Sequence, residues 1–363
     1  MIRVASPEIG DQELRAVEEV LRSGQLVQAT RVRAFEAAVE AHLGVRHAVA
    51  VSSGTAALHL ALLALGIGPG DEVLVPDFTF PASANVVELT GATPVLVDID
   101  LATYNVDVER LRAAVTARSR AVMPVHLFGL PAAMDPILEI AREKRLLVVE
   151  DAACALGAEY RGRPCGTLSE AGCFSFHPRK VITTGEGGMV VTSDGALAER
   201  IISLRSHGQV QAGGRTRFEQ AGFNYRMTEM QGALGVAQMG RLPSIVERRT
   251  ALAARYGVAL RGLDRVTLPV VPEGLRPVWQ AYVVLLAEGI DRTAVQARLR
   301  EQGIETTLGT YAVSAQPHYA GPGRPLPKSL RAQEQALALP LHPGLSEADV
   351  DTVARALGAA LGA

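Results

Sequence analysis

Short apolar runs alternate with longer segments of helical period along the first half of the chain. The runs are rich in Val, Ile and Leu and show little alternation, which is typical of strands buried on both faces. We predict strands at His47–Val51, Glu72–Val75, Pro94–Asp98, Arg120–His126, Leu146–Glu150, Gly172–Phe176 and Gly188–Thr192. Helical segments separate the first five, at Thr55–Leu65, Ala82–Leu89, Val108–Thr116 and Ala132–Lys144. This order predicts an α/β fold with a doubly wound sheet of seven strands, most of them parallel.

The last two predicted strands are joined by a short segment that has no helical pattern. A parallel crossover needs a longer connection, usually through a helix. We therefore expect one of the strands Gly172–Phe176 and Gly188–Thr192 to run antiparallel or beside a distant strand.

The pattern changes in the second half of the chain. A helix is predicted at Ala196–Ser206, and a long helical region runs from Thr228 to about Gly262, broken near Leu242–Pro243. Three prolines soon after Val266 indicate a linker or a domain edge. The segments that follow are a strand at Ala281–Leu286, a helix at Arg292–Gln302, a strand at Glu305–Leu308, a proline-rich loop at Ala315–Lys328 and a helix at Glu347–Leu361. We predict a large domain over residues 1–245 and a smaller α/β domain over residues 246–363, with the N-terminal segment packed on the small domain.

Composition excludes several classes of function. The 363 residues carry a net charge of −2 without a basic stripe, which argues against nucleic acid or an acidic membrane as partner. No apolar run is long enough to span a bilayer, and the first residues lack the apolar core of a signal peptide. Cys154, Cys165 and Cys173 form no metal-type spacing, so we expect no metal site and a reduced, cytoplasmic setting.

Candidate chemistry concentrates at two strand ends. The stretch Phe174–Gly188, FSFHPRKVITTGEGG, places Lys180 between an apolar run and a glycine-rich turn. Asp151 ends another apolar run, in LLVVEDAA. A lysine and a carboxylate in these places suit pyridoxal phosphate, since the amine forms a Schiff base and the carboxylate keeps the pyridine nitrogen protonated. Taken singly, a solvated loop lysine and a helix N-cap are the alternatives.

A phosphate and a planar ring also have candidate partners. Ser53, Gly54 and Thr55 join a strand to a helix, where small residues, free N–H groups and the helix dipole favour an anion. An ordinary N-cap is the alternative. Ser175 is a candidate hydroxyl for the phosphate, and Phe80 follows a strand end where it is placed to stack on a cofactor. A core position is the alternative for Phe80.

The chain resembles the nucleotide-sugar aminotransferases of the DegT/StrS type, which are fold-type I pyridoxal-phosphate enzymes. The resemblance runs nearly end to end through motifs in the family's order: SSGTAAL, PDFTFPASANVV, GATPVLVDID, PVHLFG, VEDAACALGA, FSFHPRKVITTGEGG, GFNYRMTEMQGALG and ALPLHP. It implies a three-layer, aspartate-aminotransferase-like large domain. It also implies pyridoxal 5'-phosphate as cofactor, pyridoxamine phosphate as its alternate form, and a homodimer with shared active sites.

The resemblance assigns roles to matching residues. Lys180 would form the Schiff base and shuttle the proton, and Asp151 would pair with the pyridinium nitrogen. Three residues would hold the phosphate, Phe80 would stack on the ring, and one residue would reach the partner subunit's cofactor phosphate. The phosphate residues are Gly54, Thr55 and Ser175, and the residue reaching across is Asn224. Cys154 departs from the glutamine or histidine common at its position, and because a thiol is a poor hydrogen-bonding partner we assign it no contact with the ring hydroxyl.

The substrates follow from the same resemblance. TTGEGG, with Glu186, resembles members that aminate C4 of a 4-keto-6-deoxy sugar nucleotide, with glutamate as amino donor. Aminotransferases acting on 3-keto sugar nucleotides or keto-inositols are the alternatives. Arg179 and Arg226 are candidates for the sugar pyrophosphate or the donor carboxylate, with ordinary surface charge as the alternative.

Two functions from other classes are the further alternatives. Related sugar dehydratases replace the Schiff-base lysine with histidine, whereas Lys180 is present here. A non-catalytic cofactor-binding protein would need an appended partner module, for which the chain has no spare length.

Overall fold

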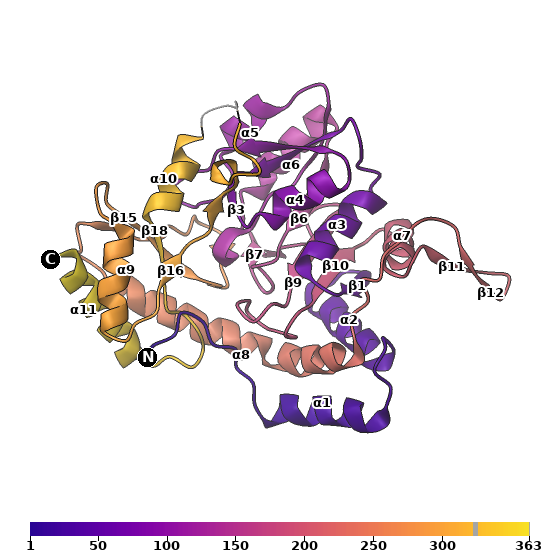
Figure 1. The fold of residues 1–363 in the computed structure, drawn as a ribbon, viewed down its shortest axis with the longest axis horizontal. Coiled ribbons are helices and arrows are strands. Elements are labelled where there is room, and N and C mark those ends of the chain that lie inside the picture. Colours follow the sequence, from indigo (N-terminus) through magenta and orange to yellow (C-terminus); the bar gives the residue numbers. More distant parts are fainter. Residues whose placement is uncertain (322–325, 363) are drawn as a thin grey trace.

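The larger part of the molecule is built around a central sheet of seven strands (Figure 1). The computed structural model describes residues 1–321 and 326–362. In sheet order the strands are β1 (His47–Val51), β10 (Gly188–Thr192), β9 (Ala171–Ser175), β6 (Leu147–Asp151), β5 (Ser119–Val122), β2 (Glu72–Pro76) and β4 (Thr93–Val97). Among these strands β10 runs antiparallel to both of its neighbours, β1 and β9, whereas the other neighbouring pairs are parallel, which confirms the expectation for the short connection between β9 and β10.

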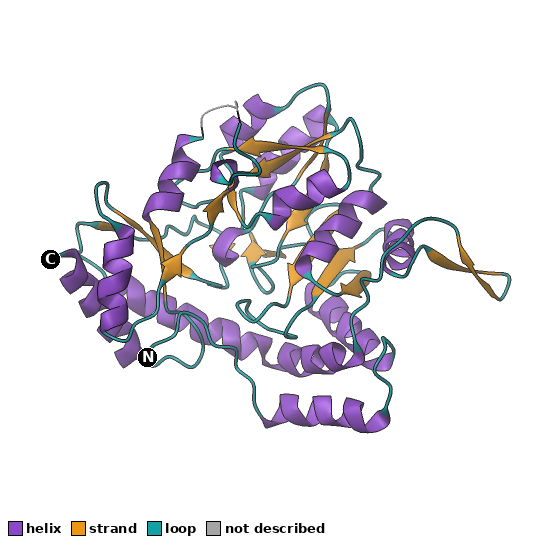
Figure 2. Ribbon diagram, in the orientation of Figure 1, coloured by secondary structure: helices purple, strands orange, loops and turns teal. Residues whose placement is uncertain are grey.

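Helices cover both faces of this sheet (Figure 2). One face packs on α3 (Gly54–Ala64), α4 (Ala82–Leu89) and α7 (Gly195–Arg205). The other packs on α2 (Thr30–Leu43), α5 (Val108–Ala114), α6 (Met134–Lys144) and the first half of α8 (Glu229–Ala259). A further helix, α1 (Asp11–Ser23), lies against the outside of α8. The predicted strands and helices of the sheet region are therefore present, and the mostly parallel α/β architecture is confirmed.

The predicted strand at Arg120–His126 ends earlier than expected, because β5 stops at Val122. Its backbone nevertheless stays between β2 and β6, since the Met123 amide donates to the Leu74 carbonyl of β2 at 2.8 Å and the His126 amide donates to the Asp151 carbonyl of β6 at 3.0 Å. The irregular pairing keeps this segment at the sheet edge where Asp151 ends its strand.

The predicted break near Leu242–Pro243 is wrong, because α8 runs through Pro243 without interruption. Proline removes one N–H bond from the ladder. The helix is held by packing on both sides of that point: Leu242 and Ile245 belong to the core under the large sheet, and Leu252 and Tyr256 belong to the core of the C-terminal region. The predicted domain boundary at 245/246 thus falls inside one continuous helix, and we propose that α8 joins two domains.

The C-terminal region is built on a four-stranded antiparallel sheet. Its strands are β13 (Val266–Thr267), β15 (Tyr282–Leu286), β18 (Ala336–Leu339) and β16 (Thr307–Leu308), and its helices are α9 (Arg292–Glu301), α10 (Pro327–Gln335) and α11 (Glu347–Leu361). The predicted loop at Ala315–Lys328 lies partly outside the described residues, and its last two residues begin α10. The N-terminal segment contacts this region, since the Ile2 amide donates to the Gly303 carbonyl at 2.8 Å.

Several short elements complete the fold. They are β3 (Phe78–Thr79) with β17 (Tyr311–Ala312), the sheet of β14 (Leu275–Arg276), β7 (Glu159–Tyr160) and β8 (Arg163–Pro164), and the 3-10 helices η1 (Leu127–Gly129) and η2 (Val313–Ala315). The hairpin of β11 (Gln209–Ala212) and β12 (Arg215–Phe218) projects well beyond the body of the molecule (Figure 1).

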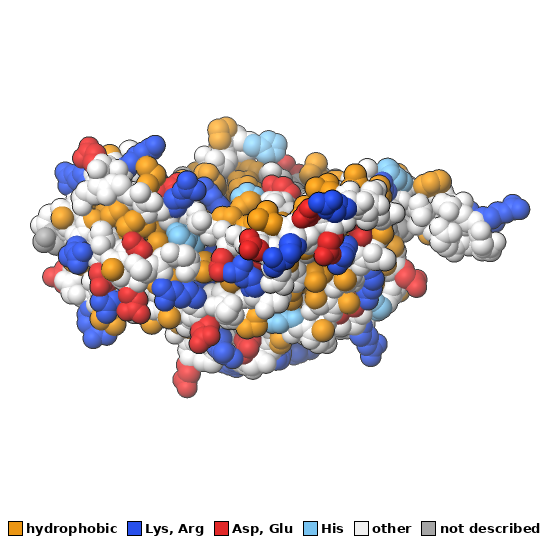
Figure 3. All heavy atoms as spheres, turned by 90° about the horizontal axis from the view of Figure 1, so that it is seen from below, with side chains coloured by type: hydrophobic (Ala, Val, Ile, Leu, Met, Phe, Trp, Pro, Cys, Tyr) orange, Lys and Arg blue, Asp and Glu red, His pale blue; other side chains and the backbone are white. Residues whose placement is uncertain are grey.

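The surface seen from below carries acidic and basic side chains interspersed, without a field of one sign (Figure 3). Within residues 1–321 and 326–362, no helix combines the length and apolar character needed to cross a membrane.

Candidate active site

Asp151 is the last residue of β6, and its carboxylate is buried, with 5% of the residue exposed. Oδ2 accepts a hydrogen bond from Ser83 Oγ at 2.7 Å, and Oδ1 accepts one from the Ala153 amide at 3.2 Å. Both donors are neutral, and no cation in the described part of the chain pairs with this carboxylate. A buried carboxylate without a counter-charge is unfavourable. A protonated pyridine nitrogen would supply the missing charge.

A small-residue cradle lies where α3 begins. A Cβ atom on Gly54 would lie 2.7 Å from Ser175 Cβ, so this close approach of helix and strand requires glycine. The Ser53 side chain caps the helix by accepting the Ala56 amide, whereas the amides of Gly54 and Thr55 have no acceptor among the described residues. Free amides at a helix N-terminus favour an anion such as phosphate.

Lys180 lies in the loop between β9 and β10 and is half-buried. Its amide donates to the His177 carbonyl at 2.8 Å, and the Gln280 side chain donates to the Arg179 carbonyl at 2.8 Å. Lys180 Nζ lies 3.1 Å from Cys154 Sγ and forms no ion pair with a carboxylate of the described chain. The loop therefore holds the lysine, and its amine is not neutralised by an acid.

Most of the remaining candidate residues are exposed. Phe80, just before α4, is 63% exposed. Arg179, Glu186 and Asn224 are exposed, and Arg226 is half-buried. Two of them are held through the backbone: Arg226 forms a bridge with Val51 at the end of β1, and Asn224 forms one with Ser206. The Glu186 carbonyl accepts hydrogen bonds from Thr184 Oγ1 and Gln231 Nε2, both at 2.6 Å, while its carboxylate has no partner among the described residues.

Sequence reasoning missed two hydroxyls beside Asp151. Ser83, in the first turn of α4, donates to the carboxylate, and Thr79 Oγ1 lies 3.2 Å from Ser83 Oγ. Both side chains are buried. In the sequence, Ser83 is only a serine on a predicted helix that follows PDFTF. Its role depends on the packing of α4 against the end of β6, which the sequence pattern does not report.

Burial shapes the electrostatics around the site. Burial, the largest cause, lowers the pKa of His177, and the charges of Lys180 and Arg179 act in the same direction against Glu186. Burial also raises the pKa of the Cys173 thiol well above its ordinary value, with Asp151 and Glu150 acting in the same direction. The site is thus a place where charges are close and poorly solvated, as is common where chemistry occurs.

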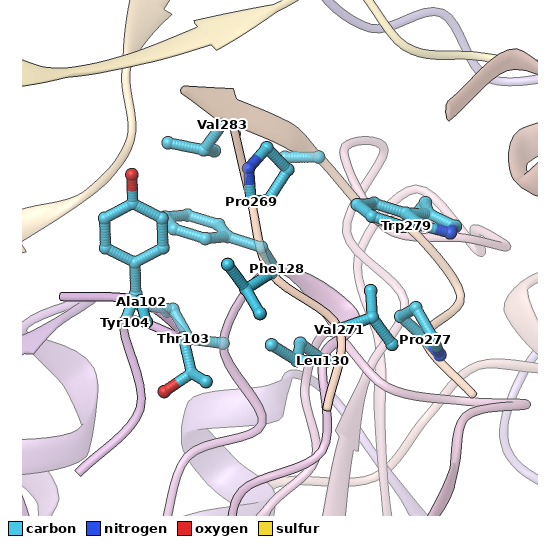
Figure 4. Close-up of a pocket in the computed structure, with 13 residues that line it drawn as sticks. Ala102, Thr103, Tyr104, Phe128, Leu130, Pro269, Val271, Pro277, Trp279 and Val283 are labelled. Atoms are coloured by element: carbon cyan, nitrogen blue, oxygen red, sulfur yellow. The ribbon is translucent and has the colours of Figure 1, made fainter. Parts of the chain in front are cut away.

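A separate apolar recess lies beside the segment that leads into the C-terminal sheet (Figure 4). Its lining consists of Ala102, Thr103, Tyr104, Leu127, Phe128, Leu130, Pro269, Val270, Val271, Pro277, Trp279, Ala281 and Val283. Neither Lys180 nor Asp151 contributes to it. Because its lining has no amine and no carboxylate, this recess lacks the groups for amino transfer, and the strand ends remain the candidate site.

Comparison with known proteins decides the family. The DegT/DnrJ/EryC1/StrS aminotransferase family model matches residues 7–358. The chain belongs to this family. It is 45% identical over 361 residues to a GDP-perosamine synthase of Caulobacter vibrioides, with 98% of this chain and 97% of the relative covered.

Solved structures agree with the assignment. DesV of S. venezuelae, in complex with a ketimine intermediate, matches with a TM-score of 0.91 and 40% identity over 96% of this chain and 93% of that chain. The sugar aminotransferase Spr1654 of Streptococcus pneumoniae in its PLP form matches with a TM-score of 0.94 and 28% identity over 99% and 98% of the two chains. This protein is therefore a pyridoxal-phosphate-dependent sugar aminotransferase of fold type I. The unpaired Asp151 carboxylate and the cradle at Gly54 fit that cofactor.

Proposed function

We propose that this enzyme moves an amino group from glutamate to a keto sugar linked to a nucleoside diphosphate, at C4 of a 4-keto-6-deoxy hexose. One observation carries the proposal: the chain matches a GDP-perosamine synthase over nearly its whole length. A GDP-linked keto sugar is accordingly the first acceptor to test. The TTGEGG turn at Glu186 supports amination at C4.

Each residue of the site has a defined task in this reaction. When bound, the cofactor supplies an electron-accepting ring. Asp151 would hold a proton at the pyridine nitrogen, Lys180 would carry the cofactor and move the substrate proton, and the amides of Gly54 and Thr55 with Ser175 would hold the phosphate. Phe80, whose side chain is largely exposed, would stack on one face of the ring.

Two arginines are candidates for binding the anionic substrates. Arg179 adjoins Lys180 in the chain, and its side chain is exposed. Arg226 is held beside the end of β1 by its backbone bridge to Val51. Both are suited to a carboxylate or a pyrophosphate, which arginine binds through two parallel hydrogen bonds.

The proposal includes a homodimer in the cytoplasm. Asn224 is exposed while its backbone is held beside Ser206, so its side chain is available to complete the phosphate site of a second copy of the chain. If so, mixing inactive Lys180→Ala with inactive Asn224→Ala restores part of the activity, because some mixed dimers contain one unaltered site. No recovery after proven subunit exchange would contradict the shared site.

The chain offers a clear test of the cofactor lysine, since its lysines are Lys144, Lys180 and Lys328. We expect the purified enzyme to be yellow, and borohydride reduction to attach the cofactor to Lys180 alone. Lys328 is paired with Asp107 at 2.8 Å and Lys144 lies on an exposed helix end, so both serve as internal controls. Attachment at either control residue would contradict the assignment.

A substrate panel tests the rest of the proposal. Glutamate alone should bleach the yellow form, and a GDP-linked 4-keto-6-deoxy hexose should restore it. Magnetic resonance of the product then locates the new amine. An amine at C3, or success of a keto-inositol alone, would overturn the C4 assignment and leave the aminotransferase assignment intact.

A further inference from the structure

Cys154 is the residue of this site for which the family resemblance provides no role. It lies three positions after Asp151 and is half-buried, and its Sγ lies 3.1 Å from Lys180 Nζ. No other hydrogen-bond partner of the lysine amine exists in the described part of the chain. The thiol and the amine therefore meet at the point where the chemistry takes place.

The loop that carries Cys154 is held on both sides. The Ala155 amide donates to the Ala152 carbonyl at 2.8 Å, and the Asp151 carboxylate accepts the Ala153 amide at 3.2 Å. The Cys154 carbonyl lies against Gly129, where an added Cβ atom would approach it to 3.0 Å. Gly129 has φ +85°, a conformation that favours glycine, so this close packing depends on the missing side chain.

The lysine loop is held by separate bonds. The Lys180 amide closes a turn on the His177 carbonyl, and Gln280 donates to the Arg179 carbonyl from the segment leading into β15. Two ordered loops thus bring the thiol and the amine together. Both ends of the contact start from backbone that is held by hydrogen bonds, and the lysine side chain spans the distance between the two loops.

We propose that Cys154 is a positioning residue that receives the Lys180 amine whenever that amine is not bonded to the cofactor. The proposal rests on the assignment of Lys180 as the cofactor lysine. During transamination the amine is released by the amino donor and must later return to the same carbon. A group that holds it nearby shortens the search for that geometry.

A thiol has suitable strength for this task. It is a weak donor and a weak acceptor, whereas a carboxylate would form a charge-assisted bond about twice as strong as a neutral one. A strongly held, protonated amine is a poor nucleophile. Cys154 holds the amine through a weak contact and not through an ion pair, which leaves Lys180 able to return to the cofactor.

The contact is tested directly with o-phthalaldehyde on the cofactor-free protein. Its two aldehydes condense with one amine and one thiol that lie together, losing two waters and forming a fluorescent isoindole. We expect one isoindole, linking Lys180 to Cys154, and we expect pyridoxal phosphate to block its formation. Cys165→Ala and Lys144→Arg are matched controls that should keep the signal, because Cys165 is buried and Lys144 is exposed at the end of α6.

Kinetics of the loaded enzyme test the positioning role. Cys154→Ala should slow both half-reactions about three- to tenfold, as expected for one lost hydrogen bond, with KM changed less than twofold. Cys154→Ser should recover most of the rate, since a hydroxyl also accepts the amine. Cys154→Asp should be slower than Cys154→Ala, because it holds the amine too firmly.

The outcomes separate this inference from the assignment on which it rests. Borohydride labelling of another lysine would defeat the lysine assignment itself. Labelling of Lys180 with no isoindole, or with Cys154→Ala as fast as the natural enzyme, would overturn the role of Cys154 alone. A serine variant no faster than the alanine variant would also overturn it.

Discussion

Glu150 and Asp151 are neighbours at the end of β6, and their environments differ sharply. Side chains alternate between the two faces of a strand, so the two carboxylates point to opposite sides of the sheet. The donors to Glu150 are the Gly166 amide at 2.7 Å, the Leu168 amide at 2.7 Å, Ser169 Oγ at 2.9 Å and His126 Nε2 at 3.0 Å. Asp151 receives two neutral donors.

The difference distinguishes a carboxylate that stabilises the fold, Glu150, from one that is available to a ligand, Asp151. Glu150 has all its bonds within the chain, and His126 is fixed as its partner because His126 Nδ1 accepts the Ala132 amide at 3.0 Å. A buried group that is fully bonded stabilises a fold and has no capacity left for a ligand. Asp151 keeps such capacity at the strand end where ligands bind in sheets of this kind.

The largest expected effect is the loss of activity in Asp151→Asn. The amide keeps the shape of the carboxylate but cannot hold a proton at the pyridine nitrogen by charge. We expect kcat for the keto sugar nucleotide to fall on the order of a thousandfold, or about 4 kcal/mol of activation free energy. The free energy of unfolding, measured in urea on the cofactor-free protein, should change by less than about 1 kcal/mol. Near-normal kcat would remove the distinction between the two acids.

Glu150→Ala is the matched substitution. It should lower the stability of the fold and leave kcat nearly unchanged, which is the reverse of the result expected for Asp151→Asn. The substitution leaves the buried Gly166 amide and His126 Nε2, and the half-buried Leu168 amide, without their acceptor. We expect the free energy of unfolding to fall by about 3 kcal/mol, since each orphaned donor carries a desolvation penalty. Protein that remains folded should keep most of its kcat. A stable but inactive variant would show that Glu150 acts in the chemistry.

Ser83→Ala tests how much the hydrogen bond from Ser83 to Asp151 contributes to catalysis. The change removes the 2.7 Å bond to Oδ2 and leaves the carboxylate in place. One neutral hydrogen bond contributes about 1 kcal/mol, so kcat should change by less than about tenfold. The absorbance of the bound cofactor during dialysis measures whether its affinity falls as well. A loss as large as that of Asp151→Asn would mean that Ser83 itself takes part in the reaction.

The sheet could be predicted from the sequence because its strands are continuous apolar runs between amphipathic segments. The β11–β12 hairpin could not, since Arg215–Phe218 is exposed throughout and has no apolar face to detect. The break predicted at Pro243 failed for a related reason. Local propensity disfavours proline in a helix, but burial of residues on both sides of Pro243 outweighs one lost hydrogen bond.

Only part of the site could be predicted from the sequence. Lys180 and Asp151 could be singled out because each follows an apolar run, and parallel strands end at the same edge of a sheet. The contacts that complete the site join distant positions: Ser83 and Asp151 are 68 residues apart, and Cys154 and Lys180 are 26 apart. Such pairs depend on how helices and loops pack over the sheet, which periodicity does not report.

Asp77 is the third buried carboxylate of this comparison. We expect its substitution to have the smallest effect, a change in how the free energy of unfolding depends on pH. Asp77 ties the large sheet to the C-terminal region, since its carboxylate accepts the Ser314 amide at 2.7 Å and Ser314 Oγ at 2.9 Å. Burial, the largest cause, raises the pKa of Asp77 above its ordinary value of 3.8, and the charge of Asp98 acts in the same direction. The fold therefore prefers the protonated form.

The sign of the pH dependence follows from that preference. Below the unfolded pKa both states of the chain are protonated at Asp77, and the stabilising contribution is fully present. It is lost as the pH rises through the raised folded pKa, because the unfolded chain ionises first. Asp77→Asn keeps an oxygen acceptor for Ser314 and cannot ionise. Urea unfolding across this acidic range should show the natural protein losing stability with rising pH relative to Asp77→Asn. Parallel curves for the two proteins would mean that Asp77 is as well compensated as Glu150, and that its burial carries no electrostatic penalty.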